Sequence, residues 1–139
     1  MVVPSVALLA LLLSCQPVPK EVPLEKYRRQ HIEGQVFIEE RLKARAPKGQ
    51  SFLLISVRNP EESAPLAVLK VKNPEFPYRF KITGKHKLDH QRLMEGEVLL
   101  TARLSSSDTP QAQKGDLIGF TTAKVGSKGI RIVLNQEVE

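Results

Sequence analysis

The stretch Tyr78-Arg79-Phe80-Lys81-Ile82 decides the fold class, because apolar and basic side chains alternate along it one by one. Successive side chains of a β-strand point to opposite faces of the sheet, so this stretch predicts a strand with one buried face. Other stretches carry a comparable strand pattern. They are residues 35–38, 51–58, 66–71, 97–104, 117–123 and 130–135.

Turn-forming residues separate these stretches. Asn59-Pro60-Glu61-Glu62 and Asn73-Pro74-Glu75 place asparagine and proline where β-turns favour them, and Gly126-Ser127-Lys128-Gly129 is typical of a hairpin turn. Residues 39–49 predict a loop with one helical turn around 41–44, and no long amphipathic helix is expected.

Seven short strands with one apolar face each predict an all-β protein. Two antiparallel sheets packed face to face bury all of these faces at once. We therefore expect a single immunoglobulin-like antiparallel β-sandwich of about seven strands over residues 32–139. A small barrel is the alternative, because a strand count does not distinguish the two.

The N-terminal residues look like the signal sequence of a bacterial lipoprotein. The apolar run Val6–Leu13 is too short to span a membrane, which takes about 20 apolar residues. Small Ser14 precedes Cys15, the only cysteine of the chain. A signal peptide of this kind is cut before the cysteine, whose sulfur carries a diacylglycerol. The alternative is an apolar leader with an incidental cysteine.

The expected organisation is a signal peptide over 1–14, a lipidated and proline-rich tether over 15–31, and the folded domain over 32–139. Pro17, Pro19 and Pro23 predict an extended spacer. Gln16, a residue other than Asp after the cysteine, favours the outer over the inner membrane by resemblance to lipoprotein sorting patterns. We expect the cell envelope, facing the periplasm.

The net charge and the distribution of basic residues restrict the classes of partner that are expected. Lysine and arginine number 21 against 15 acidic residues, for a formal net charge of +6. The basic residues are scattered and form no block that resembles a nucleic-acid footprint, so no nucleic-acid partner is expected. With Cys15 lipidated, no thiol is left for a disulfide, a nucleophile or covalent haem attachment.

The second half of the chain resembles a known family. Pro65–Lys70, Phe76–Phe80, Met94, Ala102–Ser105 and Gln113–Gly119 follow one another as in the periplasmic immunoglobulin-like domain of CycH-type cytochrome c biogenesis proteins. That domain lies at the C-terminus of its proteins, behind transmembrane helices and tetratricopeptide repeats, whose place the expected lipid anchor takes here. The resemblance covers about residues 32–134. It implies a membrane-tethered periplasmic helper of cytochrome c maturation that works by protein–protein contact.

His86, His90 and Met94 form the candidate metal site of the sequence. Their spacing of four would place them on one face of a helix, and imidazole with thioether suits copper. Thr83-Gly84-Lys85 is a poor helix start, however, and the surrounding residues are basic. We expect solvated loop histidines, a methionine packed beneath a sandwich edge, and no metal or other cofactor.

No pattern for catalysis is present. Ser105-Ser106-Ser107-Asp108 lacks the Gly-x-Ser-x-Gly elbow of hydrolases. We interpret Gly115-Asp116 as a structural turn, in which glycine supplies a positive φ and the aspartate bonds neighbouring backbone amides. No enzyme is expected.

The function predicted first is a membrane-anchored periplasmic lipoprotein, a non-catalytic accessory that contacts apocytochrome or haem-lyase components. One alternative is a periplasmic copper carrier using His86, His90 and Met94. The other is an envelope structural lipoprotein unrelated to cytochromes. An exposed sheet edge or a set of loops would make the contact, and the sequence does not choose between them.

Overall fold

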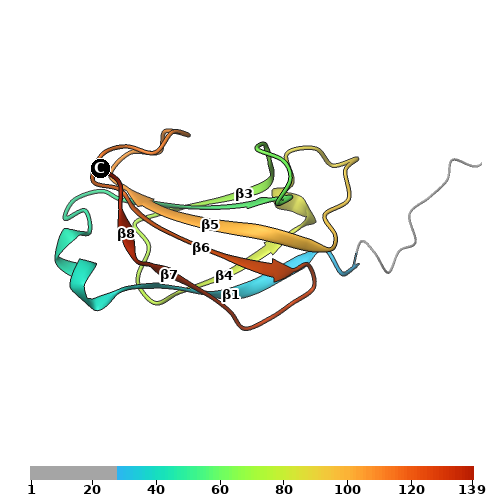
Figure 1. Cartoon of the computed structure of the whole chain (residues 1–139), viewed down its shortest axis with the longest axis horizontal. Helices are drawn as coiled ribbons and strands as arrows, with labels where there is room; N and C mark the ends of the chain where they lie inside the picture. Colours follow the sequence, from blue (N-terminus) through green and yellow to red (C-terminus); the bar gives the residue numbers. More distant parts are fainter. Residues whose placement is uncertain (1–27) are drawn as a thin grey trace, which may run out of the picture.

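The computed structural model describes residues 28–139 (Figure 1). The expected cleavage site and Cys15 lie outside the described residues, so the signal peptide and the lipid anchor stay predictions. Within the described part, no helix has the length and apolar character needed to cross a membrane.

Eight strands and two short 3₁₀-helices follow one another along this part of the chain. In order they are β1 (His31–Ile38), η1 (Glu40–Arg45), β2 (Phe52–Arg58), β3 (Pro65–Lys72), β4 (Tyr78–Thr83), η2 (Gly84–His86), β5 (Glu97–Ser105), β6 (Leu117–Lys124), β7 (Ile130–Leu134) and β8 (Gln136–Glu137).

The strands form two sheets, one with the order β4-β1-β7 and one with the order β3-β2-β5-β6-β8. Figure 1 shows them as two stacked layers, with the three-stranded sheet below the five-stranded one. The all-β immunoglobulin-like sandwich predicted from strand alternation is therefore confirmed.

The pairing of β1 with β7 differs from the all-antiparallel expectation, because these two strands run parallel. Antiparallel neighbours are commonly joined by a tight turn. β1 and β7 are far apart in the sequence, so no turn between them sets their relative direction. Gly34 permits their close approach. A Cβ atom at this position would lie 2.1 Å from the carbonyl oxygen of Ile130.

Apolar side chains from both sheets fill the space between the layers. Burial alternates along β1 and β2, as expected for strands with one face on a core. The most deeply buried large side chains are Phe80, Ile32, Leu53, Ile55, Ile82, Met94, Leu100, Leu104, Leu117, Ile132, Leu134 and Val36.

The helix η1 agrees with the sequence prediction, whereas the strand β8 was not predicted. The helical turn expected around 41–44 is present as η1, where Leu42 is buried. The strand β8 was not predicted, because its two residues carry no alternation. It forms by backbone pairing with Leu117 and Ile118 at the start of β6.

A candidate protein-binding groove

The outer face of the five-stranded sheet is built mainly from apolar and hydroxyl side chains. Strand register places residues of four strands side by side in rows across this face. One row consists of Lys70, Leu54, Arg103 and Ile118, and the next consists of Val68, Ser56, Thr101 and Phe120. Phe120, at the end of the second row, is 58% exposed and adds apolar surface to this face.

Two loops turn this face into a groove. Residues 59–64, between β2 and β3, and residues 106–116, between β5 and β6, rise above the sheet at opposite ends (Figure 1). The groove between them has a volume of about 580 Å³. Its lining comprises Leu54, Ser56, Arg58, Ser63, Pro65, Val68, Lys70, Thr101, Arg103, Asp108, Pro110, Ala112 and Ile118.

Arg103 holds the first wall, the loop 106–116. Its Nη1 donates to Asp116 Oδ2 at 2.9 Å, and its Nη2 donates to the carbonyl oxygens of Thr109 (2.5 Å) and Pro110 (3.2 Å). The exposed fractions of the Arg103 and Asp116 side chains are only 9% and 4%. This buried ion pair and the two carbonyl contacts tie the loop to β5.

The residues interpreted as a structural turn lie at the end of this wall. Gly115 has a φ of +91°, a conformation that glycine adopts without a Cβ clash. Asp116 Oδ2 accepts a hydrogen bond from the backbone N–H of Gln113 at 2.8 Å, in addition to the contact with Arg103. The Asp116 carboxylate thus links the turn to β5.

The second wall, residues 59–64, is held by side chains from two directions. Arg58 Nη1 donates to the carbonyl oxygen of Glu62 at 2.7 Å, and Asn59 Oδ1 accepts from the N–H of Glu61 at 3.0 Å. Arg92 Nη2 donates to Glu62 Oε1 at 2.6 Å, and this contact lowers the pKa of Glu62. These contacts join the turn after β2 to the loop before β5.

The chemistry of the groove is that of a binding surface. Its lining contains neither histidine nor cysteine. Its charged groups have partners: Lys70 Nζ lies 3.4 Å from Asp108 Oδ2, and Arg58 and Arg103 are bonded as described. A floor poor in unpaired charge with a polar rim is typical of a protein–protein interface.

The three residues of the sequence-predicted metal site lie in different environments. His86 ends η2, and its Nδ1 accepts a hydrogen bond from the N–H of Thr83 at 3.0 Å. Burial and the neighbouring Lys85 lower the pKa of His86. His90 is exposed, whereas Met94 is only 1% exposed and belongs to the core.

The helix that would align these residues is not formed, since η2 ends at His86. Among the residues that the structure describes, no group of three or more His, Cys, Asp or Glu side chains is placed to hold a metal ion. Metal binding by this loop stays an untested alternative.

A buried lysine that the sequence did not reveal organises the same loop. Lys87 is 6% exposed, and its Nζ donates to Gln30 Oε1 (3.0 Å) and to the carbonyl oxygens of His90 (3.2 Å) and Arg92 (2.7 Å). Gln30 Oε1 also accepts from the N–H of Met94 at 2.8 Å. A lysine in a polar loop is normally solvated, so no sequence signal pointed to this arrangement.

The same loop covers part of one sheet edge. Ala67 of β3 forms an isolated bridge with Lys87, and the N–H of Leu88 donates to the carbonyl oxygen of Leu66 at 2.9 Å. The first half of β3 is therefore closed to an added strand, which favours the groove over this edge as the contact surface.

Comparisons with known proteins point to one family. The family described as "Cytochrome c-type biogenesis protein H Ig-like domain" matches residues 32–135. The chain is also 46% identical to an uncharacterized protein of Aquifex aeolicus (strain VF5) over 140 residues, covering 95% of this chain and 93% of the relative. No solved structure matches the chain.

Proposed function

Because this chain belongs to the family of cytochrome c-type biogenesis protein H Ig-like domains, we propose that it is a lipid-anchored periplasmic accessory of cytochrome c maturation. The family itself indicates an accessory role in cytochrome c biogenesis and a periplasmic or envelope-facing location. The proposal adds the anchor at Cys15, favours the outer membrane, and assigns contact with apocytochrome or haem-lyase components without catalysis.

The groove on the five-stranded sheet is the observation that carries this proposal. Leu54, Val68 and Ile118 supply an apolar floor, and Ser56 and Thr101 supply hydroxyl groups for hydrogen bonds. This combination fits an extended apolar segment of a partner protein. The partner segment would lie along the sheet between the two loops.

The groove is lined by 13 residues, fewer than the roughly 20–30 that each partner contributes to a specific interface, so the rims take part as well. Complexes of specific proteins commonly bury about 800 Å² on each partner. Phe120 extends the apolar surface beyond the floor, in line with Thr101. Large exposed aromatic side chains are common anchors of protein interfaces.

The test uses the intact lipoprotein, purified by affinity from detergent-solubilised native membranes, with mass spectrometry of its partners. In the variant Thr101→Arg a long cation fills the middle of the groove floor, and we expect the loss of cytochrome c maturation partners. The control is Ala44→Arg, which adds the same charge at an exposed position of η1, outside the five-stranded sheet and the groove lining. We expect this variant to recover the partners.

Mass spectrometry of the N-terminal peptide tests the anchor in the same sample, with acylated Cys15 as the expected result. Equal recovery of partners by the two arginine variants would contradict the groove as the contact surface. Recovery of unrelated envelope proteins alone would favour the structural alternative. Sub-micromolar copper binding that is lost in His90→Ala would favour the carrier.

A further inference from the structure

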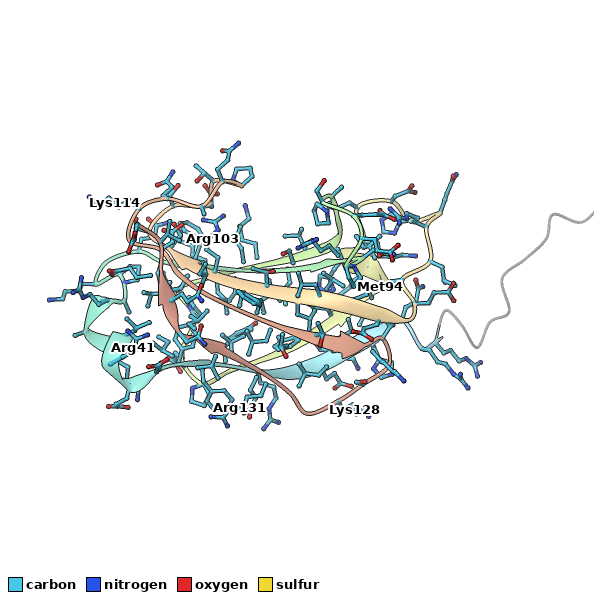
Figure 2. The ribbon with its side chains drawn as sticks, in the orientation of Figure 1. Arg41, Met94, Arg103, Lys114, Lys128 and Arg131 are labelled. Carbon is cyan, nitrogen blue, oxygen red and sulfur yellow. The ribbon has the colours of Figure 1, made fainter. Side chains whose placement is uncertain are left out.

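The outer face of the three-stranded sheet is strongly basic, in contrast to the face that bears the groove. Arg79 and Lys81 of β4, Arg131 of β7 and Lys128 of the preceding turn are all exposed on it, and we call these four residues the basic face. Figure 2 shows Lys128 and Arg131 on the side of the sandwich away from the five-stranded sheet.

The charge of this face is a large part of the total. One carboxylate, Glu33, accompanies the four cations and lies 3.8 Å from Lys128 Nζ. The resulting formal excess of three charges is half of the net charge of +6. Within residues 28–139, neither Arg79 nor Lys81 forms an ion pair, so both cations are available to an external anion.

The strand register spreads these charges over a broad surface. Gln35 of β1 has Arg79 beside it on one strand and Arg131 beside it on the other. Two strand spacings separate Arg79 from Arg131, a distance of about 10 Å between their Cα atoms. The guanidinium of Arg131 lies 4.0 Å from the ring centre of Phe37, which orients it on the sheet.

Arg79, Lys81 and Lys128 line an open hollow of about 550 Å³, and Arg131 on β7 extends the charge across the sheet. Charge spread over a whole face suits an extended anionic surface. Its middle strand β1 is the one that the N-terminal chain enters, and Cys15 precedes the first residue of β1 by 16 positions. Fully extended, that segment reaches at most about 55 Å. A lipid at Cys15 would therefore keep the start of β1, the middle strand of this sheet, within about 55 Å of the membrane.

We infer that the basic face docks on the anionic lipid headgroups of the membrane to which the chain is attached. This inference rests on the proposed membrane attachment. Lysine and arginine near an anionic leaflet are attracted to its phosphates, and the attraction adds up over the residues of one face. Docking in this way directs the groove, on the opposite sheet, away from the membrane and towards soluble partners.

The experiment measures lysine acetylation of the full chain, reconstituted into vesicles and analysed by mass spectrometry. Vesicles of phosphatidylcholine are compared with vesicles that also contain phosphatidylglycerol. In the anionic vesicles we expect slower acetylation of Lys81 and Lys128, whereas Lys72 and Lys114, outside the basic face, react equally in both. High salt should abolish the difference, because it screens exposed charges.

Two double variants test whether the cations of the basic face hold the chain on the membrane. Arg79→Ser with Arg131→Ser removes two cations, which should lower the ratio of docked to undocked chain by about thirtyfold. Lys81 and Lys128 then lose their protection. The matched control Lys72→Ser with Lys114→Ser has the same net charge, and we expect its protection to persist.

Flotation of the vesicles distinguishes a failure of membrane attachment from a failure of docking by the basic face. A chain that floats but shows equal acetylation of Lys81 and Lys128 in both vesicles overturns the docking and leaves the attachment standing. Protection of Lys72 instead would place the other sheet at the membrane and would also overturn it. A chain that floats with neither vesicle overturns attachment and docking together.

Discussion

Replacing Arg103 by methionine tests whether the first wall of the groove is held as described. The substitution leaves the buried Asp116 carboxylate without its counter-ion and removes the donors to the Thr109 and Pro110 carbonyl oxygens. Removing one partner of a buried ion pair costs about 3–5 kcal/mol. With a urea m-value of about 2 kcal/mol per molar, the midpoint of unfolding should fall by about 2 M.

Urea unfolding followed by circular dichroism measures this shift. The control is Lys70→Met, which removes the exposed pair with Asp108 and should cost at most about 1 kcal/mol. Adding Asp116→Asn to Arg103→Met should restore part of the stability, because the uncompensated buried charge is gone. A loss below about 1 kcal/mol in Arg103→Met, or a double variant no more stable than the single one, would refute a buried and coupled pair.

Two further predictions concern a close contact and a titrating side chain. A Cβ atom at Gly119 would lie 1.9 Å from the carbonyl oxygen of Val133, so Gly119→Ala should destabilise the fold by at least about 2 kcal/mol in thermal unfolding. Gly49→Ala, with no atom within 4 Å of the added Cβ, should change stability by less than about 0.5 kcal/mol. Burial lowers the pKa of His86 below the ordinary 6.5, so the folded state favours the neutral imidazole. The stability that depends on this neutral form is complete above pH 6.5 and is lost as the pH falls through the folded-state pKa. Unfolding curves at several pH values should show this loss of stability, and His86→Gln should remove the part that is due to His86. A variant whose stability depends on pH as in the unchanged protein would contradict the role given to His86.

Seven of the eight strands were predictable from the sequence, because each of these seven contains its own evidence. The alternation of residues 78–82 specifies β4 without reference to any neighbour. Proline and asparagine at 59–60 likewise specify the turn that follows β2. What such local patterns do not contain is the partner of each strand, so the parallel pairing of β1 and β7 and the short β8 were missed.

The groove was only partly visible in the sequence. Phe52 and Leu54 on the second face of residues 51–58 are apolar, which is a signal that the outer face of this strand is not simply solvated. The walls gave no such signal. Arg103 occupies a strand position and Lys87 a loop, where solvent exposure is the ordinary expectation. Arg103 is buried beneath the loop that follows its own strand, and Lys87 bonds to Gln30, which is distant in sequence, and to carbonyl oxygens of its own loop.

The parallel pairing of the first and last long strands also sets the order in which the domain can fold. Gly34 and Ile130, which face each other in this pair, are 96 residues apart in sequence. Contacts of such long range raise the relative contact order and slow folding, because the intervening chain must be closed into a loop first. As the chain is synthesised from its N-terminus, β1 can pair with β4 but has no partner on its other side until β7 has been made. The three-stranded sheet thus stays incomplete until β7 is synthesised, and a nascent chain exposes an unpaired edge of β1 until then.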